Sequence, residues 1–349
     1  MNRAVNQNKI ESWVKTRRDI HAHPELRYQE NRTSDIIAKR LVELGYKVEK
    51  DIGVTGVVGV LQGKRGPGKS IGLRADMDAL PIQEKNQFDH ASRHPGKMHA
   101  CGHDGHIAML LGAAQEFAEN PDFSGSVVLI FQPAEEGGAG AQRMIEDGLF
   151  ERYPVDAVFA MHNWPGLREG EFAAHTGPVM ASSNEFSVTI HAKGAHAAMP
   201  DLGIDPVVIA AQLIIAFQTI ISRTCKPVDP AVLSVTQIQA GEAINVIPDH
   251  AVLQGTVRTF SIETLDLIEN HMRKLCTEMC AAFGATANME FERKYPPTVN
   301  TPEMANLAKT ALETLNEVSE VHSNLPPTMG AEDFAFMLQH KPGAYFVIG

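Results

Sequence analysis

The chain of 349 residues has few cysteines and no excess of basic residues. Four scattered cysteines are not a disulfide framework, so we expect free thiols and a reducing, cytoplasmic location. The net charge of −11 argues against nucleic acid as a partner. Residues 1–9 are polar and lack the apolar segment of a secretory signal. The longest apolar run, residues 207–217, is too short to span a bilayer, so no membrane association is expected.

The remaining composition is that of an ordinary globular protein with many turns. Hydrophobic residues make up 44% of the chain, which also contains 28 glycines and 20 prolines. A chain of 349 residues exceeds the size at which a single core usually keeps growing. We therefore expect two domains.

The first half of the chain alternates between helical and strand-like patterns. Residues 9–45 have helical periodicity, which His23-Pro24 divides into two helices. Short β-rich runs follow at residues 55–61, 70–73, 126–131 and 157–161, with a helical stretch at 107–119 between the second and third. This alternation predicts an α/β domain with a mostly parallel sheet covered on both faces.

From about residue 182 the order of elements changes. A strand at 186–192, a helix at 205–222, two strands at 232–239 and 251–260, a helix at 263–283 and a strand at 287–295 follow one another. This β-α-β-β-α-β order is the ferredoxin-like split motif. We predict a discontinuous first domain, residues 1–181 and 296–349, with residues 182–295 inserted into it.

The chain ends at Gly349, directly after the apolar strand expected at residues 344–348. Domains rarely end on such a strand without an element that covers it. We therefore expect the C-terminus to be cut short.

Potential metal ligands follow several of the predicted strands. Cys101 and His103 flank a glycine just before a helix, and this loop can direct both side chains at one metal ion. Glu135 and Glu136 follow one buried strand, and His162 follows another. Because sites in open α/β sheets form beyond the carboxyl ends of strands, we expect these side chains to meet. Imidazole, thiolate and carboxylate donors together indicate a metal-dependent hydrolase.

Four further polar residues lie near these positions. Asp76 and Asp78 follow the strand that ends near Arg74, at the same edge of the sheet. His99 and His106 are interpreted as loop residues or hydrogen-bonding partners rather than metal ligands.

One motif favours a different class of function. Residues 63–70, G-K-R-G-P-G-K-S, match the phosphate-loop pattern as a string. A phosphate loop must open a helix, whereas the residues after Ser70 continue as a strand, and Pro67 removes one backbone N–H. We interpret the segment as a basic hairpin turn rather than a nucleotide site.

Two other groups of residues are assigned structural roles. Cys276 and Cys280 lie four residues apart on a predicted helix and are interpreted as packing residues. Glu332 and Asp333 are interpreted as the first residues of a helix that ends near Gln339, where acids favour the positive end of the dipole.

Six segments together resemble the metal-dependent aminoacylase/carboxypeptidase family, in the branch of hippurate hydrolases and indole-acetyl-amino-acid hydrolases. They occur in order over nearly the whole chain. The segments are R-D-I-H-A-H-P-E-L at residues 18–26, L-R-A-D-M-D-A-L-P at 73–81, H-A-C-G-H-D-G-H at 99–106, F-Q-P-A-E-E at 131–136, G-A-H-A-A-M-P at 194–200 and N-V-I-P-D at 245–249.

The resemblance implies an enzyme that hydrolyses the amide bond of N-acyl amino acids such as hippurate, N-acetyl or indole-acetyl conjugates. It implies two divalent metal ions, Mn²⁺ or Zn²⁺, with Co²⁺ and Ni²⁺ as alternatives. It also implies that the inserted domain is a lid that forms a homodimer. The implied metal ligands are Cys101, His103, Glu136 and His162.

The resemblance also implies roles for residues that contact the substrate. Glu135 would be the general base, and His196, on the lid, would reach the neighbouring subunit's site and stabilise the oxyanion. Asn245 and Arg258 would bind the substrate carboxylate. From the residues alone, His196 could equally be a loop residue, Asn245 a turn former and Arg258 a surface charge.

One departure from the family pattern keeps alternatives open. The family closes its metal site with a histidine after the strand at which this chain ends, and His340 precedes that strand. A related carbamoylase or dipeptidase, or a non-catalytic binding protein on the same scaffold, is therefore also considered.

Overall fold

The structure, a computed structural model, describes residues 6–349 and divides the chain into two compact units. The first unit contains the chain up to Val179 together with Val299–Pro326 and Asp333–Gly349. The second contains Met180–Thr298 and Pro327–Glu332, so the inserted domain predicted at 182–295 lies within it. Strands β7 (Gly177–Met180) and β14 (Thr298–Asn300) pair where the chain passes from one unit to the other.

The first unit is built on an eight-stranded mixed sheet. The four strands at its centre, β4, β3, β5 and β16, run parallel to one another, which confirms the predicted α/β class. The hairpin of β1 and β2 adds an antiparallel edge, and its first strand was missed in the sequence pattern. In spatial order the strands are β1 (Lys47–Ile52), β2 (Gly56–Gln62), β4 (Ser126–Gln132), β3 (Ser70–Asp76), β5 (Ala157–Asn163), β16 (Gly343–Ile348), β6 (Glu171–Ala173) and β15 (Glu320–His322).

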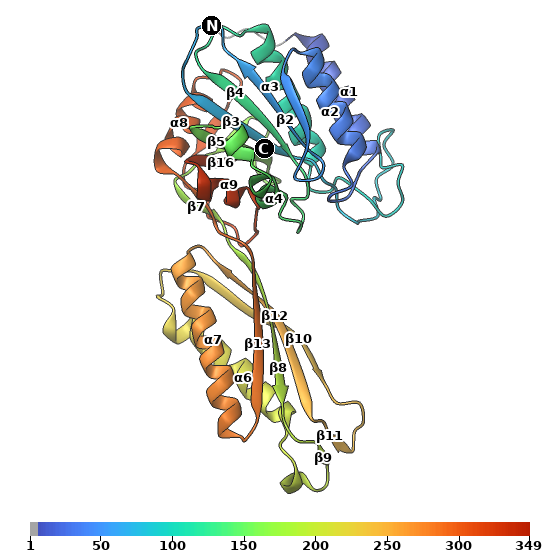
Figure 1. The fold of residues 1–349 in the computed structure, drawn as a ribbon, viewed down its shortest axis with the longest axis vertical. Helices are drawn as coiled ribbons and strands as arrows, with labels where there is room; N and C mark the ends of the chain where they lie inside the picture. The colour runs from blue at the N-terminus through green and yellow to red at the C-terminus, as the bar shows by residue number, and fades with distance from the viewer. Residues whose placement is uncertain (1–5) are drawn as a thin grey trace. The chain divides into compact units, whose positions relative to one another are not determined.

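Helices cover both faces of this sheet (Figure 1). On β4, Val127, Leu129 and Phe131 point into the core beneath α1 (Gln7–Ala22), α2 (Asn31–Glu43) and α3 (His103–Glu119). The alternate residues Val128 and Ile130 are buried on the opposite face, as the twofold repeat of a strand requires. The remaining helices of the unit are α4 (Gly140–Glu146), α5 (Leu149–Arg152), α8 (Pro302–Glu313) and α9 (Phe334–His340).

The predicted break between the first two helices is confirmed. Helix α1 ends at Ala22, directly before His23-Pro24, and α2 begins at Asn31. Proline disfavours helical backbone in the residue before it, which explains why the first helix stops here.

The second unit has the predicted ferredoxin-like order. Its four-stranded antiparallel sheet has the order β10-β12-β8-β13. Two helices pack on one face through a shared apolar core (Figure 1). Asp205 and Ser261 cap these helices with side-chain hydrogen bonds, as their types favour. The elements are β8 (Ser183–His191), α6 (Pro206–Thr219) with a π-helical turn (Ile220–Thr224), β10 (Ala231–Ala240), β12 (His250–Thr259), α7 (Ile262–Ala282) and β13 (Thr286–Tyr295).

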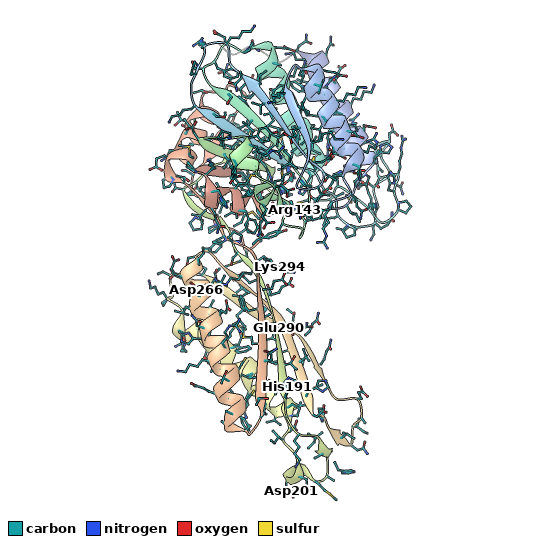
Figure 2. The ribbon with its side chains drawn as sticks, in the orientation of Figure 1. Arg143, His191, Asp201, Asp266, Glu290 and Lys294 are labelled. Atoms are coloured by element: carbon teal, nitrogen blue, oxygen red, sulfur yellow. The ribbon has the colours of Figure 1, made fainter. Side chains whose placement is uncertain are left out.

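The two faces of this second sheet differ in polarity. Cys276 and Cys280 lie in the apolar core on the helix side, which confirms that they are packing residues. On the other side, Lys294 of β13 forms an ion pair of 2.7 Å with Glu185 of β8 (Figure 2 labels Lys294).

One helical segment of the second unit is longer than the apolar run suggested. Pro206–Thr224 has 19 residues and a mean hydropathy of 1.6, enough by length and composition alone to cross a membrane. The sequence estimate based on residues 207–217 was therefore too short. Ile209, Leu213 and Phe217 of this segment are buried in the core of the unit, and 28% of the apolar window is buried in all.

One local sequence interpretation is corrected by the structure, and another is confirmed. Residues 63–70 connect β2 to β3, and because β4 lies between these strands the segment is not a hairpin turn. A strand follows the segment, as expected, and not the helix of a phosphate loop. Asp333 directly precedes α9, which ends at His340, so the predicted start of this helix is confirmed. Its buried carboxylate accepts hydrogen bonds from Arg74 and Gln132.

Candidate metal centre

The predicted ligands lie at one edge of the first unit's sheet. His162 is part of β5, Glu136 follows β4, and Cys101 and His103 stand at the start of α3. Asp76 ends β3, which lies between β4 and β5 in the sheet. Segments far apart in the sequence therefore converge at the carboxyl ends of parallel strands, where α/β sheets form their sites.

A tight turn directs Cys101 and His103 toward the same point. Gly102, between them, has a φ of +88°, and a Cβ atom there would lie 2.3 Å from Asn163 Oδ1. Only glycine combines this backbone conformation with so close an approach. The turn thus needs the glycine that the sequence places between the two candidate ligands.

The four predicted ligand side chains are close enough to share metal ions. Cys101 Sγ lies 3.3 Å from His162 Nε2, and His103 Nε2 lies 4.0 Å from Glu136 Oε1. Donor atoms of Cys101, His103 and Glu136 all lie within 4.8 Å of one another. A second group with the same property combines His103 and His162 with Asp76 and His106.

The protonation properties of this cluster favour a cation. Burial lowers the pKa of His103, but the carboxylates of Asp76 and Asp78 raise it more, so the net pKa is well above its usual range. Burial raises the pKa values of the Cys101 thiol and of the Glu136 carboxyl. Without a metal ion the cluster therefore retains protons that a metal ion would displace.

His103 supplies the most specific evidence that the cluster suits a metal ion. Its side chain is buried, and its Nε2 atom has no hydrogen-bond partner among the residues that the structure describes. Because buried polar atoms are normally paired, this atom indicates a missing partner. The thiol, imidazole and carboxylate donors around it suit Zn²⁺, Mn²⁺ and similar divalent ions.

Asp78 holds the glutamate loop, a role that the sequence did not indicate although it placed Asp78 at this edge of the sheet. Its two carboxylate oxygens accept hydrogen bonds from the backbone N–H groups of Glu135, at 3.1 Å, and Glu136, at 2.9 Å. Asp78 Oδ1 also lies 3.3 Å from His103 Nδ1. The available signal was the position of Asp78 two residues beyond the end of β3.

His106 is bonded to the protein on both ring nitrogens. Nδ1 lies 2.6 Å from Asp76 Oδ1, and Nε2 lies 2.6 Å from Asn163 Oδ1 and 3.0 Å from the backbone N of Asn163. His106 also belongs to the second donor group described above, so whether it is a metal ligand stays a prediction. Burial raises the pKa of Asp76, but the charges of His103, Arg74 and His106 lower it more. The pKa of Asp76 therefore lies well below its usual range.

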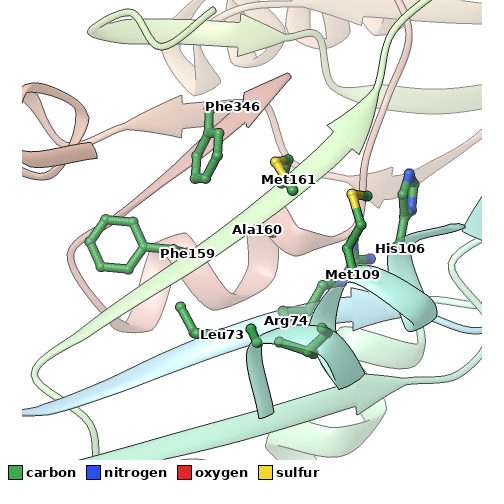
Figure 3. Close-up of a pocket in the computed structure, with 10 residues that line it drawn as sticks. Leu73, Arg74, His106, Met109, Phe159, Ala160, Met161 and Phe346 are labelled. Carbon is green, nitrogen blue, oxygen red and sulfur yellow. The ribbon is translucent and has the colours of Figure 1, made fainter. Parts of the chain in front are cut away.

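An apolar cavity of about 150 Å³ lies beside this cluster (Figure 3). His106 and Met109 of α3 line it together with Phe159 and Met161 of β5 and Phe346 of β16. Since its walls are mainly apolar, it adds no donors to the candidate metal centre.

Three predicted substrate-contacting residues lie in the second unit. His196, in β9 (Ala195–His196), and Asn245 are exposed and adjacent, because Val246 of β11 (Val246–Ile247) pairs with His196. His196 lines a cavity of about 850 Å³ at this end of the unit. Arg258 lies on β12, half-buried, and burial lowers its pKa.

Within the second unit, Arg258 lies far from His196 and Asn245. His250, at the start of β12, lines the same cavity as His196. Arg258 is eight residues further along that strand, which corresponds to roughly 26 Å. His340, by contrast, belongs to none of the candidate donor groups among residues 6–349.

Comparison with known proteins identifies the family. Residues 72–349 match Peptidase family M20/M25/M40. The chain belongs to this family. It is 42% identical over 346 residues to thermostable carboxypeptidase 1 of Saccharolobus solfataricus, covering 97% of this chain and 86% of that protein. It is 41% identical over 333 residues to hippurate hydrolase of Campylobacter jejuni, covering 95% and 86% respectively.

A solved structure supports the same assignment. The crystal structure of the Bacillus subtilis YXEP protein, a dinuclear metal binding peptidase from the M20 family, matches with a TM-score of 0.87. It is 36% identical, and the match covers 99% of this chain and 90% of that one. This M20 member is thus a hydrolase that acts on amide bonds.

Proposed function

We propose that this M20 enzyme hydrolyses the amide bond of N-acyl amino acids with two divalent metal ions held by Cys101, His103, Glu136 and His162. The observation that carries the proposal is that His103 shares one donor group with Cys101 and Glu136 and another with His162. Its buried Nε2 atom has no hydrogen-bond partner among residues 6–349. The hippurate hydrolase relative acts, by its name, on such a conjugate. Mn²⁺ and Zn²⁺ are the proposed ions, with Co²⁺ and Ni²⁺ as alternatives.

Glu135 is the proposed general base. When bound, the metal ions polarise the amide carbonyl and make the attacking water more acidic. Glu135 lies next to the ligand Glu136, is largely buried at 7% exposure, and its backbone is held by Asp78. Its carboxylate accepts the proton of the water and returns it to the leaving amine.

Residues of the second unit are proposed to bind the substrate. Arg258 offers a guanidinium for the substrate carboxylate, and Asn245 offers an amide. His196 is proposed to donate a hydrogen bond to the developing oxyanion. Since roughly 26 Å separates Arg258 from the His196 end of the unit, one small substrate cannot contact both in the same copy.

That separation supports a homodimer in which a partner subunit supplies one of these groups. Helix α6 presents exposed apolar side chains, among them Val207, Val208 and Ile215, of which Ile215 is 69% exposed. Exposed apolar side chains of this kind suit burial against a second copy. Light scattering of the wild type and of Ile215→Glu would test it, because only the variant should dissociate.

A cytoplasmic location is proposed on the basis of the cysteines. All four are unpaired in the structure, including the neighbours Cys276 and Cys280. Free thiols are typical of reducing compartments. Fractionation of the native host with antibody detection would show whether the protein is found there.

A substrate panel tests the proposed reaction. The metal-loaded enzyme should release free amino acid from N-benzoylglycine, N-acetyl and indole-acetyl amino acids, with no release in the presence of a chelator. Peptides are the second candidate, since one relative is a carboxypeptidase. If peptides, dipeptides or N-carbamoyl amino acids are cleaved faster than N-acyl amino acids, the proposed substrate class is wrong. Binding without turnover of any of these would leave a binding protein on the same scaffold.

A further inference from the structure

The residue before the catalytic glutamates has an uncommon backbone conformation. Ala134 has a φ of +54° and is completely buried. A residue with a Cβ atom rarely adopts this left-handed conformation and keeps it only where surrounding contacts impose it. The strained position directly precedes Glu135, so whatever holds Ala134 also determines where the base points.

A buried carboxylate from another part of the chain holds Ala134. Glu30 is completely buried, and its Oε1 atom accepts a hydrogen bond of 2.9 Å from the backbone N–H of Ala134. Its Oε2 atom accepts a hydrogen bond of 2.7 Å from the Thr55 hydroxyl. Burial raises the pKa of Glu30 to about 6, although both hydrogen bonds lower it.

Glu30 does not cap the following helix with its side chain, although it occupies the N-cap position of α2. Glu25 instead accepts hydrogen bonds from the backbone N–H groups of Arg32, at 3.0 Å, and Thr33, at 2.8 Å. The Glu30 side chain therefore faces inward, toward the glutamate loop and Thr55.

Two buried carboxylates together hold three successive amides of this loop. Glu30 accepts from the N–H of Ala134, and Asp78 accepts from those of Glu135 and Glu136. Fixing three consecutive N–H groups determines the direction of the backbone through the base and the neighbouring ligand. Such support is what places catalytic groups accurately.

We propose that Glu30 is a positioning residue for the general base Glu135 and acts through the backbone of Ala134. This inference rests on the proposed hydrolysis and on the role of Glu135 in it. Glu30 touches neither the substrate nor the metal donors in this account. Its contribution is a hydrogen-bond acceptor that keeps Ala134 in its left-handed conformation.

Matched substitutions separate the acceptor of Glu30 from its charge. In the metal-loaded enzyme, Glu30→Asp retains the charge but is one methylene too short, so kcat for N-benzoylglycine should fall roughly 10- to 100-fold. KM and bound metal should stay within about threefold of wild type, since the substrate and metal contacts are unchanged. Glu30→Gln retains an acceptor of the right length and should preserve kcat within about threefold.

A second pair of variants tests the route through Ala134. Glycine adopts positive φ readily, so Ala134→Gly added to Glu30→Asp should restore at least part of the lost kcat. Thr55→Val removes the other partner of Glu30 and should leave kcat near wild type. Circular dichroism of each variant establishes that it is folded before rates are compared.

These measurements distinguish a failure of the proposed hydrolysis from a failure of the positioning role of Glu30. If wild type hydrolyses no panel substrate, the proposed function fails. If wild type is active and Glu30→Asp matches it, the positioning role is wrong. It is also wrong if Glu30→Gln loses as much activity as Glu30→Asp, or if Ala134→Gly restores nothing.

Discussion

The two units hold their candidate functional residues in different ways. In the first unit, His103 and Glu135 are buried, and carboxylates hold the backbone or ring next to them. In the second unit, His196 and Asn245 are exposed on short strands and a loop at one end. The first arrangement suits chemistry that needs fixed geometry, and the second suits groups that engage a substrate only on binding.

The largest effect is expected from the base of the first unit. Glu135→Gln removes the proton acceptor while preserving shape, so kcat should fall about 10³-fold. Metal content, measured by atomic emission, should be unchanged because Glu135 is not a proposed ligand. Loss of metal along with activity would instead make Glu135 a ligand and break the assignment of roles.

The next largest effect is expected from His196, which is exposed on β9 in the second unit. His196→Ala removes a donor to the developing oxyanion and should lower kcat about 100-fold, with the fold unchanged. His191→Ala, on the same unit in β8 (Figure 2), is a matched control that should retain activity. Equal activity of both variants and wild type would leave His196 as a surface residue.

A smaller effect is expected from the support behind the catalytic loop. Asp78→Ala removes the acceptor for two backbone N–H groups and the neighbour of His103 Nδ1. Activity or metal affinity should fall roughly 10- to 100-fold. Titration with Zn²⁺ and steady-state kinetics would measure both. If neither changes, the loop is held without Asp78.

Arg258 should affect substrate binding more than chemistry. Arg258→Ala removes a charged partner of the substrate carboxylate, so KM should rise about tenfold with kcat nearly unchanged. Arg258→Lys should reverse only part of the rise in KM, because lysine lacks the planar guanidinium group that can donate two hydrogen bonds to a carboxylate. A substrate amide without the carboxylate should show no difference between the variants and wild type. A fall in kcat alone would contradict the binding role.

The smallest effect concerns stability and the buried Glu30. Burial raises its pKa to about 6, above the ordinary 4.5, so the folded protein binds more protons than the unfolded chain between these values. Stability present below pH 4.5 is therefore lost as pH rises through about 6, by about 2 kcal/mol. Urea unfolding of the metal-free protein should show this loss in wild type and not in Glu30→Gln. If the unfolding free energies of wild type and Glu30→Gln change with pH in parallel, the raised pKa of Glu30 is contradicted.

Sequence patterns predicted most of the framework because each element carries a local signal. The alternating helices and strands predicted the α/β sheet, and the β-α-β-β-α-β order predicted the second unit. The edge strand β1 was missed, since its charged residues Lys47, Glu49 and Lys50 hide the strand pattern. The segment at 63–70 was misjudged because pairing through β4 is not visible locally.

The candidate site was partly predictable for a related reason. Glu135, Glu136 and His162 lie at expected strand ends, and Cys101 and His103 lie at the expected start of a helix. The structure brings the four proposed ligands together. The supporting contacts of Asp78 and Glu30 were not predictable. These depend on backbone N–H groups more than 50 residues away along the chain, and no spacing rule reports such contacts.

The metal requirement tests the central claim most directly. Bound metal per chain and the rate of N-benzoylglycine hydrolysis should be measured on the same sample as metal is removed and then restored. The account predicts two ions per chain in the active protein, with activity lost on removal and regained on restoration. Hydrolysis that continues after all metal has been removed would contradict it.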